Sequence, residues 1–130
     1  TDQAEAFYIA VYETVQRIPR GRVTSYGHIA LLIDAPQNSR QVGSALKYLR
    51  DVPELSDSYQ IDNEAENWWT EFNSRTVPWW RVISADGKIA VRARGAMDAQ
   101  GERLQAEGIE VRDDGNRRPR IINMREYGWF

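Results

Sequence analysis

Two adjacent tryptophans, Trp79 and Trp80, stand between Pro78 and Arg81. An indole is neither a base nor a nucleophile in water, but its flat ring stacks on aromatic and apolar groups. Pro78 fixes its own φ and biases Val77 toward extended geometry, so we expect a stiff extended segment. Neighbours on such a segment point to opposite faces. The pair therefore predicts one indole in the core and the other lining a surface or pocket, although two packing residues would also fit.

Cysteine is absent from the chain, and His28 is its single histidine. Without thiols the chain forms no disulfide, no thiolate metal site and no cysteine nucleophile. We expect no metal and no cofactor. No apolar run approaches the roughly 18 residues that cross a membrane, and no signal-peptide pattern opens the chain. We therefore expect no membrane association and an intracellular location, which is the nucleus in a eukaryote and the cytoplasm otherwise.

The acidic residues are concentrated in one segment. The 130 residues carry a net charge of −2 and suffice for one domain with one core. Residues 51–76 hold seven acidic residues and one basic residue, whereas the rest of the chain holds 16 basic and 12 acidic ones. The segment also contains Tyr59, Trp68, Trp69 and Phe72, which is too aromatic for a simple disordered linker. We predict a mildly basic body with an acidic insertion partly folded onto it.

Helical periodicity predicts a mainly α-helical domain. The expected helices cover residues 4–18, 26–33, 39–49 and about 97–107. Thr24 or Ser25 can accept a hydrogen bond from the first free amides of the second helix. Asn38 or Ser39 can cap the third helix in the same way.

The third predicted helix has two distinct faces. Its apolar stripe, expected to pack inward, consists of Val42, Ala45, Leu46 and Leu49. The opposite face is small at its centre and basic at its ends, with Arg40, Gly43, Ser44 and Lys47. A helix, a tight turn and a helix with such a face form a helix-turn-helix pattern. A solvated helix face would produce the same pattern.

After the tryptophans, the dipeptide Asp86-Gly87 separates two short segments, 81–83 and 88–91. Asp-Gly is a strong hairpin signal because both central residues of the turn tolerate positive φ. We therefore expect a β wing here. Two further short strands and a docked aromatic tail are expected at residues 109–111, 120–122 and 127–130.

Several segments together resemble the O6-alkylguanine-DNA alkyltransferases. Residues 78–82, Pro-Trp-Trp-Arg-Val, match the Pro-Cys-His-Arg-Val active-site box of that family. They resemble still more closely the alkyltransferase-like proteins, in which tryptophan commonly replaces the reactive cysteine. Residues 18–30, 39–46 and 103–108 match in the same order. The resemblance implies a winged helix-turn-helix of the alkyltransferase C-terminal-domain type, mainly α with a small β wing, as one domain over 1–130.

The resemblance implies binding without alkyl transfer. Trp79 stands at the cysteine position, Trp80 at the histidine position, and Glu107 matches the carboxylate of the family. Transfer needs a thiolate and a group that takes its proton, and an indole supplies neither. His28 lies in the helix-turn-helix, where we expect it to be a surface or packing residue. We therefore expect no enzymatic activity.

The resemblance also implies how DNA is held. A damaged guanine is inspected by rotating it out of the stack, with the recognition helix in the minor groove. Arg40 would fill the gap left by the base, and Tyr26 would press on the adjacent phosphate, unless Tyr26 only packs at its helix start. The expected lesion pocket consists of Trp79, Arg92, Tyr26, Val77 and Pro78, with Arg92 or Arg94 as its lid. The expected DNA contacts are Thr24, Ser25, Tyr26, Arg40, Gln41, Gly43, Ser44 and Lys47.

We expect a monomeric, non-enzymatic sensor that binds O6-alkylguanine in double-stranded DNA and flags it for nucleotide excision repair proteins. Two alternatives are compatible with the residues. A sequence-reading winged-helix regulator would bind undamaged duplexes of different sequence with very different affinities. A protein-interaction adaptor would use the acidic, aromatic insertion and have little affinity for DNA.

Overall fold

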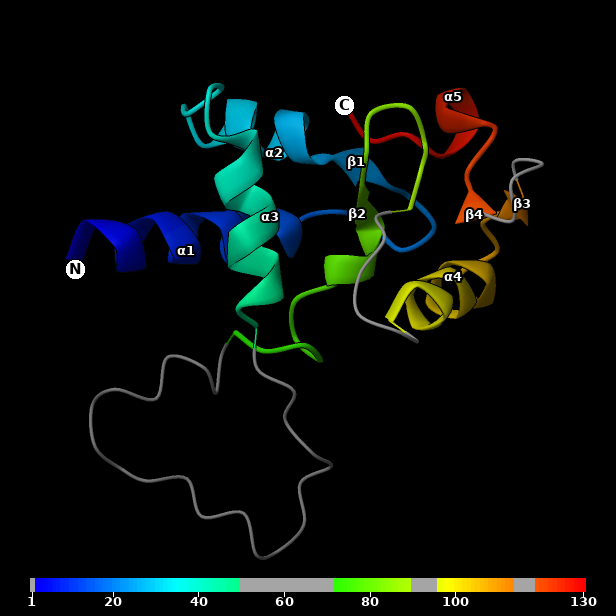
Figure 1. The fold of residues 1–130 in the computed structure, drawn as a ribbon, viewed down its shortest axis with the longest axis horizontal. Coiled ribbons are helices and arrows are strands. Elements are labelled where there is room, and N and C mark those ends of the chain that lie inside the picture. The colour runs from blue at the N-terminus through cyan, green and yellow to red at the C-terminus, as the bar shows by residue number, and fades with distance from the viewer. Residues whose placement is uncertain (1, 50–71, 90–95, 114–118) are drawn as a thin grey trace, which may run out of the picture.

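The computed structural model describes residues 2–49, 72–89, 96–113 and 119–130. Its elements are α1 (Asp2–Val15), β1 (Thr24–Ser25), α2 (Tyr26–Leu32), α3 (Ser39–Lys47), the 3-10 helix η2 (Trp79–Arg81), β2 (Val82–Ile83), α4 (Ala96–Ala106), β3 (Arg112–Asp113), β4 (Pro119–Arg120) and α5 (Met124–Tyr127). The N-terminal helices lie on one side of the β1–β2 pair, and α4, β3 and β4 lie on the other (Figure 1). The predicted mainly helical fold with small sheets is confirmed.

The first three helices pack around one buried cluster. Helical spacing turns Val11, Tyr12 and Val15 of α1 inward, and all three are fully buried. The predicted stripe of α3 is confirmed, since Val42 and Ala45 are equally buried. The Tyr12 hydroxyl donates to the Ala45 carbonyl at 2.7 Å, which joins α1 to α3. Burial raises the pKa of Tyr12 well above its usual value, so this hydroxyl keeps its proton at neutral pH.

Each long helix ends slightly before its predicted limit. After α1 the amide of Ile18 donates to the Val15 carbonyl at 3.1 Å, and after α3 the amide of Leu49 donates to the Leu46 carbonyl at 3.3 Å. Such i to i−3 bonds tighten the last turn and take the place of α-helical bonds. The residues that follow each helix are therefore still hydrogen-bonded to its last turn, although they lie outside the helix.

The β wing differs from the prediction. The Asp86-Gly87 turn forms, with Gly87 at a φ of 87°. However, β2 pairs in parallel with β1, and Lys88 bridges to Arg120 of β4. In the described part of the chain a single backbone bond, from Ser84 to Lys88, joins the two arms. The predicted regular hairpin between 81–83 and 88–91 is therefore wrong for the described residues. Residues 90 and 91 lie outside them.

Tertiary contacts explain the different pairing. The Gln100 side chain of α4 donates to the Val82 carbonyl at 3.2 Å and so occupies an acceptor of β2. On the turn itself, the Ile121 amide donates to the Gly87 carbonyl at 2.9 Å. A Cβ on Gly87 would lie 2.2 Å from the Ile121 carbonyl oxygen, so only glycine fits there. The turn is thus attached to the C-terminal segment.

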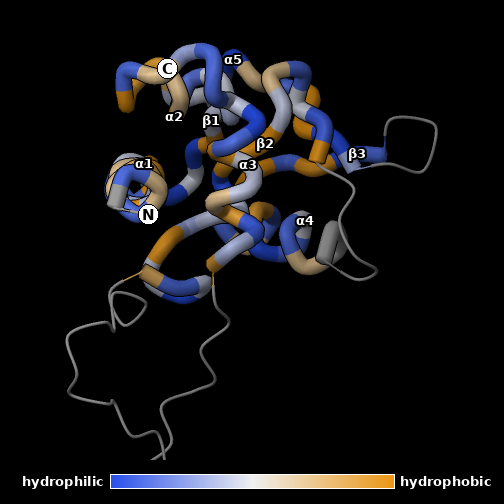
Figure 2. The backbone as a smooth tube through the Cα atoms, turned by 60° about the vertical axis from the view of Figure 1, so that its left-hand side comes forward, coloured by the Kyte–Doolittle hydropathy of each residue, from blue (hydrophilic) through white to orange (hydrophobic). Residues whose placement is uncertain are grey.

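A second buried cluster lies between β2, α4 and the C-terminal segment. It consists of Val23, Ile83, Ile89, Leu104, Ile109 and Ile121. The two strands beside it do not lie at the predicted positions 109–111 and 120–122. Instead, β3 and β4 pair Arg112 with Arg120. Figure 2 shows hydrophobic stretches of the chain next to β2 and α3.

The aromatic tail docks on the body, as predicted. The Trp129 amide donates to the Val23 carbonyl at 2.7 Å, and the Val23 amide donates to the Tyr127 carbonyl at 2.8 Å. The short helix α5, which leads into this tail, was not predicted from the sequence. The Asn123 side chain accepts a hydrogen bond from the Glu126 amide at 3.1 Å and so begins this helix.

The C-terminal end of the predicted insertion belongs to the core. Phe72 is 7% exposed, and its ring centroid lies 5.7 Å from that of Tyr12. The buried Asn73 side chain accepts hydrogen bonds from the amides of Arg75 and Thr76, which builds a turn before Val77. The last residues of the predicted insertion at about 51–76 therefore pack on the body, in line with the expected partial folding. Its residues 51–71 lie outside the described ones.

No helix among the described residues combines the length and the apolar character needed to span a membrane. The same part of the chain contains no group of three or more histidine, aspartate or glutamate side chains placed to hold a metal ion.

Candidate nucleic-acid interface

The two tryptophans lie on a 3-10 turn and not on an extended segment. The Trp79 amide donates to the Val77 carbonyl at 2.7 Å, and the Arg81 amide donates to the Pro78 carbonyl at 3.0 Å. The indoles still diverge, with ring planes at 87° and centroids 6.0 Å apart. Each is half-buried, so neither is a fully buried core indole, and the expectation that one of them lines a surface or pocket stays a prediction. Trp79 packs against the cluster of α1–α3, and Trp80 packs against the cluster beside α4.

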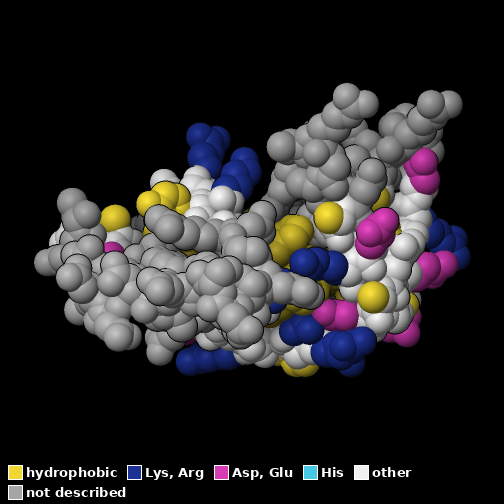
Figure 3. All heavy atoms as spheres, turned by 90° about the horizontal axis from the view of Figure 1, so that it is seen from below, with side chains coloured by type: hydrophobic (Ala, Val, Ile, Leu, Met, Phe, Trp, Pro, Cys, Tyr) yellow, Lys and Arg dark blue, Asp and Glu magenta, His cyan; other side chains and the backbone are white. Residues whose placement is uncertain are grey.

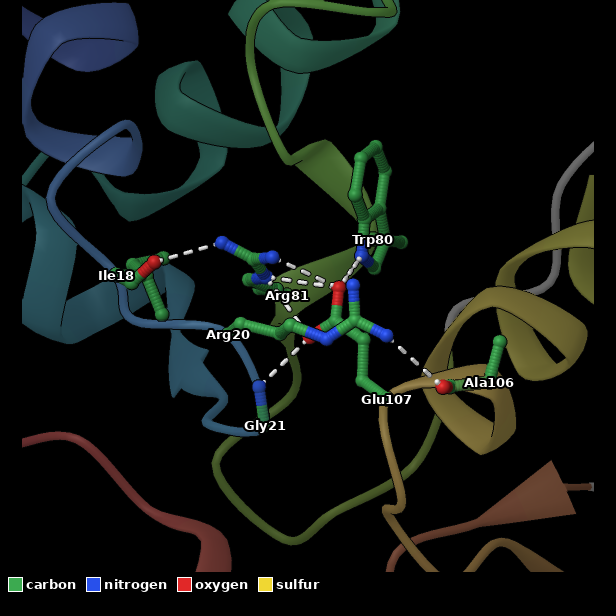
Figure 4. A network of polar contacts seen from close by, with 7 residues as sticks. All are labelled: Ile18, Arg20, Gly21, Trp80, Arg81, Ala106 and Glu107. Atoms are coloured by element: carbon green, nitrogen blue, oxygen red, sulfur yellow. Dashed lines mark hydrogen bonds and ion pairs between the residues drawn. The ribbon is translucent and has the colours of Figure 1, made fainter.

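Glu107, directly after α4, is the centre of a polar network (Figure 4). The Trp80 indole N–H donates to its Oε2 at 2.6 Å. The Arg81 guanidinium donates to the same carboxylate from Nε at 3.0 Å and from Nη2 at 2.8 Å. The Gly21 amide donates to Oε1 at 2.8 Å. One carboxylate therefore joins η2, the loop after α1 and the end of α4.

The electrostatics of Glu107 follow from this network. Partial burial by itself raises the pKa of the carboxyl group, but the hydrogen bonds from Arg81, Gly21 and Trp80 outweigh it and hold the pKa below its usual value. Glu107 is therefore ionised at neutral pH. Arg81 also donates to the Ile18 carbonyl at 2.8 Å, so its guanidinium is bound on two sides.

The network is arranged like a proton relay, but it cannot transfer a proton. Trp80 presents an N–H to Glu107 from the position at which an alkyltransferase would have its histidine. An indole N–H donates a hydrogen bond but has no second nitrogen that could take a proton. The site can therefore hold η2 in place, and it has no base for activating a nucleophile at Trp79.

Arg103 is a residue of this site that the sequence interpretation missed. Its guanidinium carbon lies 4.6 Å from the ring centroid of Trp80 and 5.7 Å from that of Trp79, within the range of cation–π attraction. Arg103 and Glu107 are four residues apart near the end of α4, so they share one side of it. This spacing could have predicted the position of Arg103 from the sequence. With Glu107 placed beside the tryptophans, Arg103 would have been expected beside them too.

The exposed face of α3 carries its predicted polar residues. Arg40, Gln41, Ser44 and Lys47 are all exposed. The Ser44 hydroxyl donates to the Arg40 carbonyl at 3.3 Å, so it is satisfied within the helix. Figure 3, which views the molecule from below, shows Lys and Arg side chains in separate groups and not in one continuous patch. This dispersion agrees with the net charge of −2.

Tyr26 and Gly43 bring α2 and α3 together. Tyr26 is half-buried against the α1–α3 cluster. A Cβ added to Gly43 would lie 3.8 Å from the Tyr26 ring, so the ring covers the small residue of α3. Tyr26 thus packs at its helix start, and its exposed part lies beside the polar face of α3. The pressing of Tyr26 on a phosphate stays a prediction.

Several predicted site residues are not on the surface. Thr24 is fully buried in the β1–β2 pair, so we withdraw it as a DNA contact. Ser25 is 6% exposed, and its Oγ accepts from the His28 amide at 3.1 Å, which confirms it as the cap of α2. Val77 and Pro78 are buried as well and support the segment of Trp79 from within. They are not exposed parts of a pocket wall.

The remaining candidates lie elsewhere. Arg92 and Arg94, the two candidates for the lid, are outside the described residues. His28 contacts the C-terminal tail, with ring centroids 5.9 Å from Trp129 and 5.2 Å from Phe130. Its expected packing role is confirmed, and it does not belong to the Glu107 network.

Comparison with known proteins places this geometry in a family. Residues 6–109 match the family model of the 6-O-methylguanine DNA methyltransferase DNA-binding domain. Alkyltransferase-like protein 1 of Schizosaccharomyces pombe is 34% identical over 126 residues, covering 96% of this chain and 95% of that protein. The chain belongs to the alkyltransferase-like family. A second relative, named DNA base-flipping protein, from Vibrio parahaemolyticus, is 32% identical over 125 residues, or 96% of this chain and 97% of that protein.

The fold comparison agrees with the family assignment. The crystal structure of S. pombe Atl1 in complex with damaged DNA containing O6-carboxymethylguanine superposes with a TM-score of 0.73 at 33% identity. The match covers 97% of this chain and 96% of that one. As an alkyltransferase-like protein without cysteine, the molecule is not an alkyl-transferring enzyme. It is a DNA-binding member of the family.

Proposed function

We propose that this alkyltransferase-like protein is a non-enzymatic sensor of O6-alkylguanine in double-stranded DNA. One observation carries the proposal: two indoles stand at the nucleophile and base positions of the transferases, and the Glu107 network holds Trp80 and the neighbouring Arg81 in place. A site so constructed binds a flat base and does not react with it. The similarity to Atl1 in complex with damaged DNA supports the same assignment.

In this proposal α3 enters the minor groove with its exposed face. Ser44 is small and exposed at the centre of this face, so the helix can approach the DNA closely there. Arg40 is exposed on the same face, and its planar cation can stack on bases and fill the gap left by a flipped nucleotide. Tyr26 lies beside Gly43, where it can press on the adjacent phosphate. Together these residues would favour rotation of the damaged nucleotide out of the stack.

The flipped base would stack on Trp79. Trp79 is half-buried and packs on the α1–α3 cluster, so it presents a supported aromatic surface. A ring of this kind contacts the base and a neutral alkyl group through dispersion and apolar burial. No thiol is present to remove the alkyl group, and both oxygens of Glu107 already accept hydrogen bonds. The lesion would therefore remain in the DNA while it is bound.

A sensor that leaves its lesion intact needs a second system to remove it. We propose that a monomer marks the site for nucleotide excision repair proteins, in the nucleus of a eukaryotic cell or in the cytoplasm of a prokaryotic one. The bound protein, and the distortion that accompanies a flipped base, would be the signal that these proteins detect. A pull-down on immobilised lesion duplex with and without this protein would measure such recruitment.

The test of lesion sensing is a titration with matched duplexes at physiological salt. One duplex carries a single O6-methylguanine, and its control has guanine at the same position. We expect clear preference for the lesion and weak binding to the control, because a protein with a net charge of −2 gains little from phosphates alone. Equal affinity for both duplexes would contradict lesion sensing. Strong differences among undamaged sequences would indicate a sequence-reading regulator instead.

A further inference from the structure

The guanidinium of Arg103 lies over both indoles of the site. Its central carbon is 4.6 Å from the Trp80 ring centroid and 5.7 Å from the Trp79 ring centroid, and the side chain is exposed. A cation–π contact attracts the guanidinium through its positive charge and needs none of its hydrogen bonds. The N–H groups of Arg103 are therefore still available as donors.

Arg103 differs in this respect from Arg81, the other arginine beside the tryptophans. Arg81 donates to the Glu107 carboxylate and to the Ile18 carbonyl, and its charge is balanced by the ion pair. Arg103 forms no hydrogen bond and no ion pair with any residue that the structure describes. Glu107, four positions along the chain, already accepts from Trp80, Arg81 and Gly21. A cation without an ion-pair partner among the described residues therefore stands against the proposed base wall.

We propose that Arg103 is a specificity-determining residue that selects O6 substituents carrying an anionic oxygen over neutral alkyl groups. This inference rests on the proposed function, in which the flipped base and its O6 substituent lie against Trp79. A carboxymethyl group in that place would lie beside the guanidinium of Arg103, which contacts the same indole. Its two oxygens can accept a pair of charge-assisted hydrogen bonds from one guanidinium. A methyl group in the same place meets only indole.

A phosphate of the DNA backbone is a second anion that Arg103 could contact. The geometry favours the substituent, because stacking holds the guanidinium against Trp79 and Trp80, whereas a phosphate contact requires no such restraint. The two sources differ in their consequences. A phosphate contact contributes equally to every duplex and to the salt dependence of binding, whereas a substituent contact acts only on the anionic lesion.

The experiment measures Kd for three duplexes that differ at one position, which carries O6-carboxymethylguanine, O6-methylguanine or guanine. Arg103→Gln should weaken binding of the carboxymethyl duplex by about tenfold or more, the scale of a hydrogen bond to a charged group. Its effect on the methyl duplex should stay below about twofold, since that lesion offers no charged partner. Arg103→Lys should lie between wild type and Arg103→Gln on the carboxymethyl duplex, because lysine keeps the charge without the planar fork.

Lys47→Gln is the matched control, since it removes one positive charge from the exposed face of α3. It should weaken all three duplexes by a similar factor. Arg103 is exposed, so both Arg103 variants should keep the wild-type unfolding temperature. Equal weakening of all three duplexes by Arg103→Gln would overturn the proposal in favour of a phosphate contact. Unchanged binding would overturn it outright. Failure of the wild-type protein to separate either lesion from guanine would instead refute lesion sensing itself.

Discussion

At the residue scale, the Trp80 indole donates a hydrogen bond to Glu107 but cannot accept a proton. The indole N–H to Oε2 distance of 2.6 Å shows that a tryptophan can occupy the structural position of a histidine in this network. Arg81 and Gly21 complete the shell of donors around the carboxylate. The polar groups of the site therefore stabilise its structure, and its aromatic rings are the groups available for binding.

The pH dependence of folding tests this reading of Glu107. Its folded-state pKa is lowered, so its contribution to stability is present above the unfolded pKa of about 4.3 and is lost as the pH falls through the folded pKa. We expect Glu107→Gln to be less stable than wild type at pH 7, with the difference shrinking as the pH falls below about 4. Urea unfolding of both proteins from pH 7 to pH 3 measures this. A difference that is independent of pH would show that the charge of Glu107 is not what stabilises the network.

A thiol placed at Trp79 would show whether the missing base also keeps the site inert. Trp79→Cys alone should not become an alkyltransferase, because an unassisted cysteine has a pKa near 8.5 and is only a few per cent thiolate at neutral pH. Trp80→His in addition would restore cysteine, imidazole and carboxylate together, and should allow transfer if the ring reaches the thiol. Mass spectrometry after incubation with an O6-methylguanine duplex detects one alkyl group per protein.

The outcomes for these variants separate two causes of inactivity. Efficient stoichiometric transfer by Trp79→Cys alone would refute the claim that the missing base keeps the site inert. No transfer by a folded, lesion-binding double variant would mean that the geometry of the pocket also differs from that of the enzymes. Each change removes a half-buried indole, so a loss of a few kcal/mol per site is expected and folding must be verified first.

At the element scale, α3 separates packing from recognition on its two faces. Val42, Ala45 and Leu46 hold it to α1 and α2, while Arg40 and Lys47 remain exposed. The helix can therefore lose a side chain on one face without loss of the contacts on the other. This separation makes the role of Arg40 accessible to mutation.

Arg40→Ala should weaken lesion binding by about 1–3 kcal/mol, the scale of a well-placed base contact. A fluorescent reporter base at the lesion should also report less flipping, because the gap in the stack loses the side chain that fills it. The unfolding temperature should not change, since Arg40 is exposed. A variant that unfolds, or that binds the lesion as wild type does, would contradict this role.

At the scale of the whole molecule, the acidic segment and the core overlap at Phe72. Phe72 packs on Tyr12 and belongs to the α1–α3 cluster, so Phe72→Ala should destabilise the protein by about 3–5 kcal/mol. Phe72 therefore belongs to the core, and the predicted insertion can be exchanged only up to residue 71 without removing it. A thermal or urea unfolding curve measures the effect.

Replacing residues 51–71 by a short flexible loop should keep cooperative unfolding, because the entropic cost of closing a loop changes slowly with its length. The change removes seven acidic residues. Non-specific DNA binding should become tighter and more salt-dependent as a result. A salt titration with an undamaged duplex measures both. Loss of cooperative unfolding would show that Trp68 or Trp69 belongs to the core, whereas unchanged salt dependence would show that the acidic residues lie too far from the DNA to matter.

The sequence by itself determined the properties that depend on residue type and short-range spacing. The apolar stripe of α3, the cap at Ser25 and the turn at Gly87 follow from helical periodicity, a local hydrogen bond and a positive φ, and each is present. The absence of alkyl transfer is equally local, because it needs only the lack of cysteine. The family resemblance supplied the rest of the functional prediction, and the comparisons support its DNA-binding part.

Only the tertiary structure decided which distant groups meet. Arg103 is brought over Trp79 and Trp80 when α4 packs beside η2, and Gly21 reaches Glu107 across 86 positions of the chain. Likewise, β2 pairs with β1 and Lys88 with Arg120, while the Gln100 side chain donates to the Val82 carbonyl. Local patterns cannot contain these contacts, since each depends on packing between segments far apart in the chain. Burial is decided in the same way, which is why Thr24 is an interior residue and not a DNA contact.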